Sequence, residues 1–177
     1  MARNIEIKAR ITRVIDLIGP AAAIADQGPI EILQDDTFFD CHAGRLKLRA
    51  FSNSQGELIF YQRSNQSGPK ESFYVRTPTA APDSLRETLT LAYGAVGRVR
   101  KHRTLFLAGR TRIHLDAVED LGDFLELEVV LDDDEPLENG IREAHRLMQQ
   151  LDVTPSQLID RAYVDLLAEV RSHQQKA

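Results

Sequence analysis

Apolar and acidic residues alternate along one stretch of the chain, Phe124-Leu125-Glu126-Leu127-Glu128-Val129-Val130-Leu131. A period of two is typical of a β-strand with one apolar and one polar face. Glu126 and Glu128 share the polar face, because side chains two residues apart on a strand point the same way. The stretch therefore predicts a half-buried strand that presents a pair of carboxylates.

Similar patterns recur along the chain and predict an α+β fold. Strands are expected at residues 4–11 and 45–49, and at about 30–40, 57–63, 71–78, 96–108 and 110–118. With residues 124–131 these make eight strands. Apolar residues at helical spacing predict helices over 12–25, 83–94, 140–151 and from Thr154 onward. Pro20 should break or restart the first helix, and a capping box at Thr154 should begin the last.

Composition restricts the classes of protein to which the chain can belong. Its 177 residues, 42% hydrophobic and 28% charged, fit a single domain over 1–177. Lys and Arg total 22 against 27 Asp and Glu, and this net charge of −5 opposes general binding to nucleic acid or anionic membranes. Cys41 is the single cysteine, which excludes an intramolecular disulfide and favours a reducing, cytoplasmic location. No apolar run reaches the roughly 18 residues that a membrane span needs.

The polar faces of the expected strands carry mostly cations. An ordinary solvent-facing surface mixes both signs, but here nearly every strand repeats a positive charge. If the strands close into a barrel with their apolar faces outward under the helices, the cations converge on its interior. Such a density of charge needs compensating carboxylates or a bound polyanion. The predicted substrate-binding residues are Lys8, Arg10, Arg45, Lys47, Arg49, Arg63, Lys101, Arg103 and Arg112.

Carboxylates occur on only three of these polar faces. They are Glu6 in the first strand, Asp116 in the seventh, and the pair Glu126 and Glu128 in the last. Clustered carboxylate oxygens suit Mg²⁺ or Mn²⁺, which keep some waters and bridge to substrate phosphates. We therefore predict a divalent-metal site formed by these four acids.

Several motifs, taken in order, resemble those of the CYTH family of triphosphate tunnel metalloenzymes. The resemblance covers nearly the whole chain and is nearest to members similar to class IV adenylate cyclases; thiamine and inorganic triphosphatases belong to the same family. It implies an eight-stranded antiparallel tunnel that binds a small-molecule triphosphate with divalent metal, with Glu6, Lys8, Glu126 and Glu128 as catalytic residues. The motifs are Ile5-Glu6-Ile7-Lys8, residues 34–40, 45–49 and 98–103, Arg112-Ile113-His114-Leu115-Asp116-Ala117-Val118, and residues 121–128 and 162–167.

One position departs from the family pattern. The opening motif of the family is Glu-x-Glu-x-Lys, and Asn4 stands where its first glutamate is expected. An amide oxygen can still hold a metal or a water but brings no charge, so one of two metal positions is weakened. A second hypothesis is therefore a binding module that retains triphosphate or polyphosphate affinity with weak or lost catalysis.

Other residues admit more than one interpretation. His114 shares a face with Arg112 and Asp116, and it either contacts a phosphate or base or is a hydrogen-bonded structural histidine. Residues 94–112 are rich in arginine and lysine and carry no acid, which is also typical of an RNA or DNA contact. Only half of those cations can share one face, so no nucleic-acid partner is expected. A monomer or homodimer fits the chain equally well.

Overall fold

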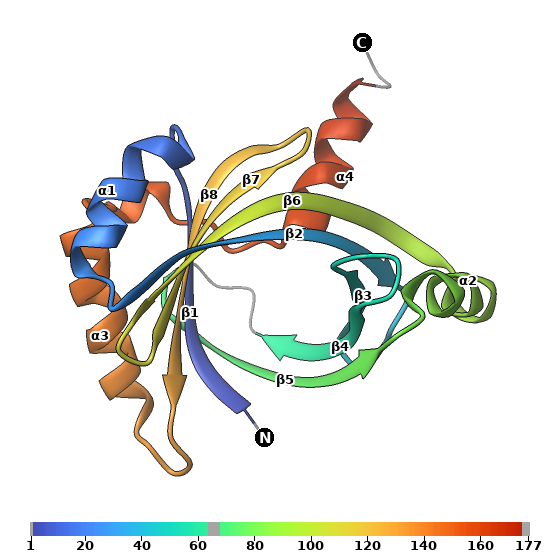
Figure 1. Ribbon diagram of the computed structural model, residues 1–177, viewed down its shortest axis with the longest axis horizontal. Helices are drawn as coiled ribbons and strands as arrows, with labels where there is room; N and C mark the ends of the chain where they lie inside the picture. Colours follow the sequence, from blue (N-terminus) through green and yellow to red (C-terminus); the bar gives the residue numbers. More distant parts are fainter. Residues whose placement is uncertain (1, 64–67, 175–177) are drawn as a thin grey trace.

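The computed structural model describes residues 2–63 and 68–174, and within them eight antiparallel strands form a closed ring (Figure 1). Around the ring the order is β1-β5-β4-β3-β2-β6-β7-β8. This confirms the predicted α+β fold with an eight-stranded barrel. The strands are β1 (Ala2–Arg10), β2 (Gln27–Phe39), β3 (Arg45–Ala50), β4 (Gly56–Arg63), β5 (Lys70–Thr79), β6 (Ala95–Ala108), β7 (Thr111–Val118) and β8 (Gly122–Leu131).

Four α-helices in the described part of the chain cover the outside of the ring (Figure 1). Helices α1 and α3 lie on one side, where they contact β7, β8 and β1, and α2 lies on the opposite side against β2 and β3. None of the described helices is both long and apolar enough to span a membrane. The helices are α1 (Val14–Ile24), α2 (Pro82–Tyr93), α3 (Leu137–Gln150) and α4 (Tyr163–Gln174).

The apolar faces of the strands point outward, as the alternation predicts. Ile5, Ile7 and Leu127 are at most 1% exposed and pack against Ala144 and Leu147 of α3. A smaller cluster of Phe39 and Leu48 with Leu89 lies under α2. Burying one such side chain contributes about 1.5–3 kcal/mol. Because this apolar layer is outside, the alternate, charged residues must face the interior of the ring.

The C-terminal segment covers one end of the ring. Its capping box forms, with Gln157 Oε1 accepting from Thr154 N at 2.9 Å, but it begins only a 3₁₀ turn over Pro155–Gln157. The chain then follows β1, where Ile159 N donates to the carbonyl of Lys8 at 3.0 Å. The predicted helix therefore starts only at Tyr163, because this backbone contact holds the intervening residues extended. Buried residues at this end are Phe38, Val99, Val118, Phe124, Ala162, Tyr163, Val164 and Leu167.

Helix α1 continues through Pro20, so the predicted break is absent. A proline removes one backbone hydrogen bond and strains the turn before it. The next residue, Ala21, is fully buried in the main apolar cluster, which also contacts Leu17, Ile18 and Ile24 of the same helix. Tertiary packing on both sides of the proline therefore keeps the helix in one piece.

Candidate functional site

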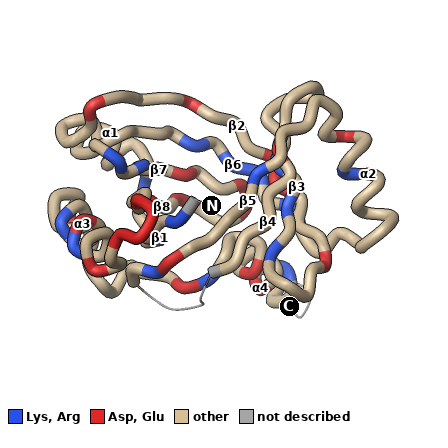
Figure 2. The backbone as a smooth tube through the Cα atoms, turned by 90° about the horizontal axis from the view of Figure 1, so that it is seen from below, with Lys and Arg blue, Asp and Glu red and all other residues tan. Residues whose placement is uncertain are grey.

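The interior of the ring is a polar cavity of about 300 Å³. Basic and acidic positions are interspersed along its neighbouring strands rather than separated into patches (Figure 2). Most of the predicted site residues reach this cavity, so the closed sheet brings together side chains from distant parts of the chain. The predicted residues that line it are Glu6, Lys8, Lys47, Arg49, Lys101, Arg103, Arg112, Glu126 and Glu128.

A buried aspartate on β2 fixes the two cations of β3. Arg49 donates from Nε and Nη2 to the two oxygens of Asp36, both at 2.7 Å, and Lys47 Nζ donates to Asp36 Oδ2 at 2.9 Å. Burial alone would raise the pKa of Asp36, but Arg49 and Lys47 hold it well below its usual value. Burial and the nearby Arg49 lower the pKa of Lys47 to about 8. Asp36 therefore stays ionised and orients both cations toward the cavity.

The same arrangement recurs between β6 and β7. Arg103 donates from Nε and Nη2 to Asp116 at 2.7 Å, and Lys101 Nζ donates at 2.9 Å. Tyr163 adds its hydroxyl to Asp116 Oδ2 at 3.0 Å. Burial would raise the pKa of Asp116, yet Arg103 and Lys101 keep it well below its usual value. Asp116, predicted from the sequence to bind metal, thus makes ion pairs with interior cations in this structure.

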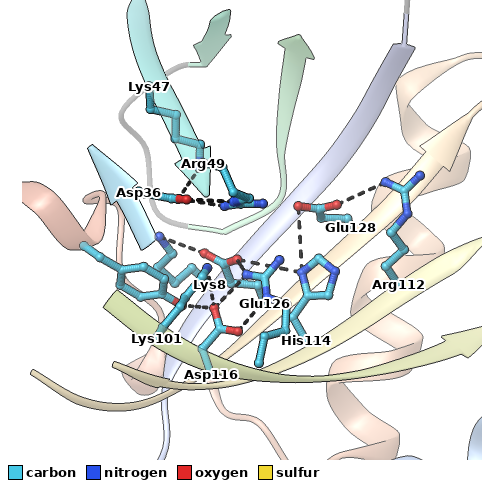
Figure 3. Close-up of polar contacts among 12 residues, drawn as sticks. Lys8, Asp36, Lys47, Arg49, Lys101, Arg112, His114, Asp116, Glu126 and Glu128 are labelled. Carbon is cyan, nitrogen blue, oxygen red and sulfur yellow. Dashed lines mark hydrogen bonds and ion pairs between the residues drawn. The ribbon is translucent and has the colours of Figure 1, made fainter. Parts of the chain in front are cut away.

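The acid pair of β8 lies where these cations converge (Figure 3). Glu126 accepts from Lys8 at 2.9 Å through Oε1 and from Arg103 at 2.6 Å through Oε2. Glu128 Oε2 pairs with Arg112 Nη1 at 3.2 Å. Burial opposes ionisation of Glu126, but Lys8 and the other interior cations lower its pKa well below the usual value. Both glutamates are therefore held in defined positions at the cavity wall.

His114 is a site residue whose position the sequence left open. It lies on β7 directly opposite Glu126 of β8 and is 3% exposed. Its Nδ1 is 3.8 Å from Glu126 Oε2 and 3.8 Å from Glu128 Oε1, with no hydrogen-bond partner among the described residues. Burial and Arg103 lower the pKa of His114 below its usual value. Ligand atoms of these three residues lie within 4.8 Å of one another.

Two further oxygen-bearing side chains reach the cavity from β1. Glu6 lies between Glu128 of β8 and Lys70 of β5 in the strand register. Asn4 is 1% exposed, and within the described part of the chain its Oδ1 has no hydrogen-bond partner. Lys70 is the first residue of β5, just outside the range predicted for that strand; it is 1% exposed, and its Nζ donates to the carbonyl of Asp160 at 3.5 Å.

Other predicted cations lie away from the cavity. Arg10, the last residue of β1, sits over the ring of Phe124 at 4.7 Å and donates to the carbonyl of Leu121. Arg45 makes a bidentate contact with Asp165 of α4, at 3.1 and 2.6 Å. Strand alternation predicts the face of a side chain but not its depth along the ring, which explains both cases. The side chain of Arg63 lies outside the described residues.

A second hollow, of about 660 Å³, is lined by residues of α2, of the segment that follows β3, and of β2, β6 and β7. Arg98 there is bound at both ends of its fork by Asp35, and its side chain is 43% exposed. The charges of this ion pair are screened by water and already compensate each other on the surface. The interior cavity, with its buried and converging charges, is therefore the stronger candidate site.

Comparisons with known proteins agree with this geometry. The family model of the CYTH domain matches residues 2–163. Adenylate cyclase CyaB of Aeromonas hydrophila is 25% identical over 171 residues, which cover 90% of this chain and 86% of that protein. The PH1012 protein of Pyrococcus horikoshii has a similar structure, with a TM-score of 0.81, 20% identity, and coverage of 92% and 98% of the two chains. A conserved Pyrococcus furiosus protein matches equally well, with a TM-score of 0.81, 20% identity and coverage of 92% and 99%.

Proposed function

Because the chain belongs to the CYTH domain family, we propose that it is a divalent-metal-dependent enzyme that binds the triphosphate of its substrate inside the ring. The observation that carries this proposal is the convergence of buried cations on one cavity. Lys8, Lys101 and Arg103 are each at most 7% exposed, although exposed positions are the rule for such residues. A bound polyanion such as a triphosphate would explain why so many cations are buried around one cavity.

The aspartates keep these cations ready for phosphate oxygens. Asp36 accepts from Nε and Nη2 of Arg49, so the Nη1 side of that guanidinium can face a ligand. Asp116 holds Arg103 by the same two nitrogens, and Nη2 of Arg103 also contacts Glu126. Arginine binds phosphate through its planar fork and lysine as a point charge. Cations fixed in advance stabilise charge that develops during phosphoryl transfer without reorganising.

The donor set of the cavity fits a divalent cation. Unpartnered buried atoms, His114 Nδ1 and Asn4 Oδ1, accompany the carboxylates there. Glu6, Glu126 and Glu128 would hold the ion, which when bound would polarise a phosphoryl group. Lys8 would keep Glu126 oriented at 2.9 Å while also facing the substrate.

The attacking oxygen decides the reaction. Attack by water on the terminal phosphorus breaks the terminal phosphoanhydride bond and hydrolyses a nucleoside, thiamine or inorganic triphosphate. Attack by a ribose 3′-hydroxyl on the α-phosphorus forms a cyclic nucleotide and releases pyrophosphate. The name of the Aeromonas relative favours the second reaction.

Product analysis tests this proposal. The purified protein is incubated with Mg²⁺ or Mn²⁺ and separately with ATP, thiamine triphosphate or tripolyphosphate, and the products are separated by chromatography. Turnover of at least one substrate, lost in Glu126→Gln, is the expected result. A folded protein that leaves all three unchanged contradicts the enzymatic proposal.

Asn4 favours a second candidate function, a triphosphate-binding module with weak catalysis. The amide supplies no charge where the family has a glutamate. In that case a triphosphate should raise the melting temperature even when EDTA removes all metal. Unchanged activity in Asn4→Glu would count against this alternative, because a restored carboxylate should then raise turnover.

A further inference from the structure

The imidazole of His114 lies beside two carboxylates, but its Nδ1 makes no hydrogen bond to a described residue. Its Nδ1 lies 3.8 Å from one oxygen of Glu126 and 3.8 Å from one oxygen of Glu128 (Figure 3). The two oxygens of Glu128 have different neighbours: Oε2 pairs with Arg112, and Oε1 faces the imidazole. The side chain of His114 is 4% exposed, so bulk water does not compensate it.

Among the described residues, Nδ1 of His114 has no hydrogen-bond partner in either tautomer. A protonated Nδ1 is a donor with no acceptor at hydrogen-bond distance, and an unprotonated Nδ1 directs its lone pair at two carboxylates. Each case carries the energetic cost of an unmatched buried polar group. A cation between the three side chains would give Nδ1 of His114 a partner and would add to the cations that already pair with the two glutamates.

The spacing fits a single ion. Nitrogen and oxygen ligands lie about 2.0–2.2 Å from a first-row divalent metal, so ligands on opposite sides of one ion are about 4 Å apart. The three ligand atoms here lie within 4.8 Å of one another and at 3.8 Å for each contact of His114. Small shifts of the two carboxylates toward His114 would bring all three atoms to coordination distance.

The nature of the donors indicates which ion. Mg²⁺ prefers an all-oxygen shell, whereas imidazole nitrogen binds transition metals more strongly. The CYTH family has a glutamate at the position of Asn4, so this chain lacks one hard anionic ligand there. We propose that His114, Glu126 and Glu128 form a mixed nitrogen and oxygen site that favours a first-row transition ion such as Mn²⁺ over Mg²⁺. This inference rests on the proposed function and specifies which ion serves it.

Direct metal binding tests the inference without turnover. Metal-free protein is titrated with Mn²⁺, and free Mn²⁺ is measured by electron paramagnetic resonance, alone and in competition with Mg²⁺. Electron spin-echo modulation then reports whether an imidazole nitrogen coordinates the bound ion. The wild-type protein should bind Mn²⁺ with a nitrogen coupling and prefer it to Mg²⁺.

His114→Gln and a surface control separate this histidine from the others. His114→Gln should lose the nitrogen coupling and weaken Mn²⁺ binding by about tenfold or more, while Mg²⁺ binding changes little. The control His102→Gln lies on β6 with its side chain 52% exposed, and it should leave both unchanged. Thermal melting checks that both variants are folded. If His114→Gln does not fold, the presence or absence of a nitrogen coupling in the wild-type protein decides whether the site exists.

The outcomes distinguish this inference from the proposed function. Bound Mn²⁺ without a nitrogen coupling, or a coupling that survives in His114→Gln, overturns the site. A coupling assigned to His114 in a protein that turns over no triphosphate supports the site and contradicts the enzymatic function instead.

Discussion

Replacement of Asp36 by asparagine tests whether buried carboxylates organise the interior cations. The side chain of Asp36 is 4% exposed and accepts hydrogen bonds from Arg49 and Lys47 at 2.7–2.9 Å. Asp36→Asn keeps the shape but removes the charge, which leaves two cations uncompensated. Breaking a buried ion pair by removing one partner costs about 3–5 kcal/mol, so we expect a loss of that size in the free energy of unfolding.

The neighbouring residue provides a matched control. Asp35 lies on the opposite face of β2, is 27% exposed, and binds Arg98 through the same two-point contact at 2.7 and 2.5 Å. Exposed ion pairs contribute about 0–1 kcal/mol, so Asp35→Asn should cost no more than that. Urea unfolding followed by circular dichroism measures both variants. Equal losses would refute the claim that burial makes Asp36 special.

The same variant has a defined dependence on pH and ligand. Arg49 and Lys47 depress the pKa of Asp36, so its contribution to stability is present above the ordinary value near 4 and is lost progressively as the pH falls further. The gap between wild type and Asp36→Asn should therefore shrink below about pH 4. Metal-free tripolyphosphate should raise the melting temperature of the variant more than that of the wild type, because its oxygens can replace the missing carboxylate.

Four further changes examine the ring and its interior. Leu127→Asn places an amide in the outer apolar layer, where Leu127 is fully buried, and should cost at least about 3 kcal/mol of stability. Glu126→Gln should change stability by only about 1–2 kcal/mol, because it relieves repulsion between the two glutamates but leaves a cation less compensated, and it should abolish metal-dependent turnover. A stable Leu127→Asn together with an unfolded Glu126→Gln, seen in thermal melts and assays, would mean that the inward and outward faces of β8 are assigned the wrong way round. Asn4→Glu should strengthen metal binding and raise turnover, as measured by calorimetry and product analysis, and a variant with weaker binding would argue against a ligand at this position. Lys47 loses its charge above its pKa of about 8, so the affinity for metal-free ATP should fall between about pH 7 and 9, and Lys47→Arg should remove that fall; an unchanged pH profile would contradict the assigned role.

The ring of strands could be predicted from the sequence because alternation is a strong local signal. The pattern at Glu126-Leu127-Glu128 predicts both the strand and its inward and outward faces, and the burial of Leu127 agrees with it. Helix boundaries followed less closely, since local signals compete with tertiary contacts. The capping box at Thr154 forms as expected, but the hydrogen bond from Ile159 to β1 keeps the following residues out of a helix.

The sequence predicted most of the residues that line the cavity but not which of them pair with one another. Parity places Lys101, Arg103 and Asp116 on inward faces, but it cannot show that Asp116 accepts from both cations and from Tyr163. The position of His114 relative to Glu126 depends on the register of β7 with β8, which no local pattern determines. Depth along the ring is equally hidden, which is why Arg10 has the predicted parity but lies outside the cavity.

Crystallography of the protein with Mn²⁺ and a non-hydrolysable ATP analogue tests the central claim most directly. The account predicts the triphosphate inside the ring, with its oxygens within hydrogen-bond distance of Arg49, Lys101 and Arg103. Anomalous scattering should locate the metal beside Glu126 and Glu128. A triphosphate bound on the outer surface, or an interior that stays free of ligand at saturating concentration, would contradict the account.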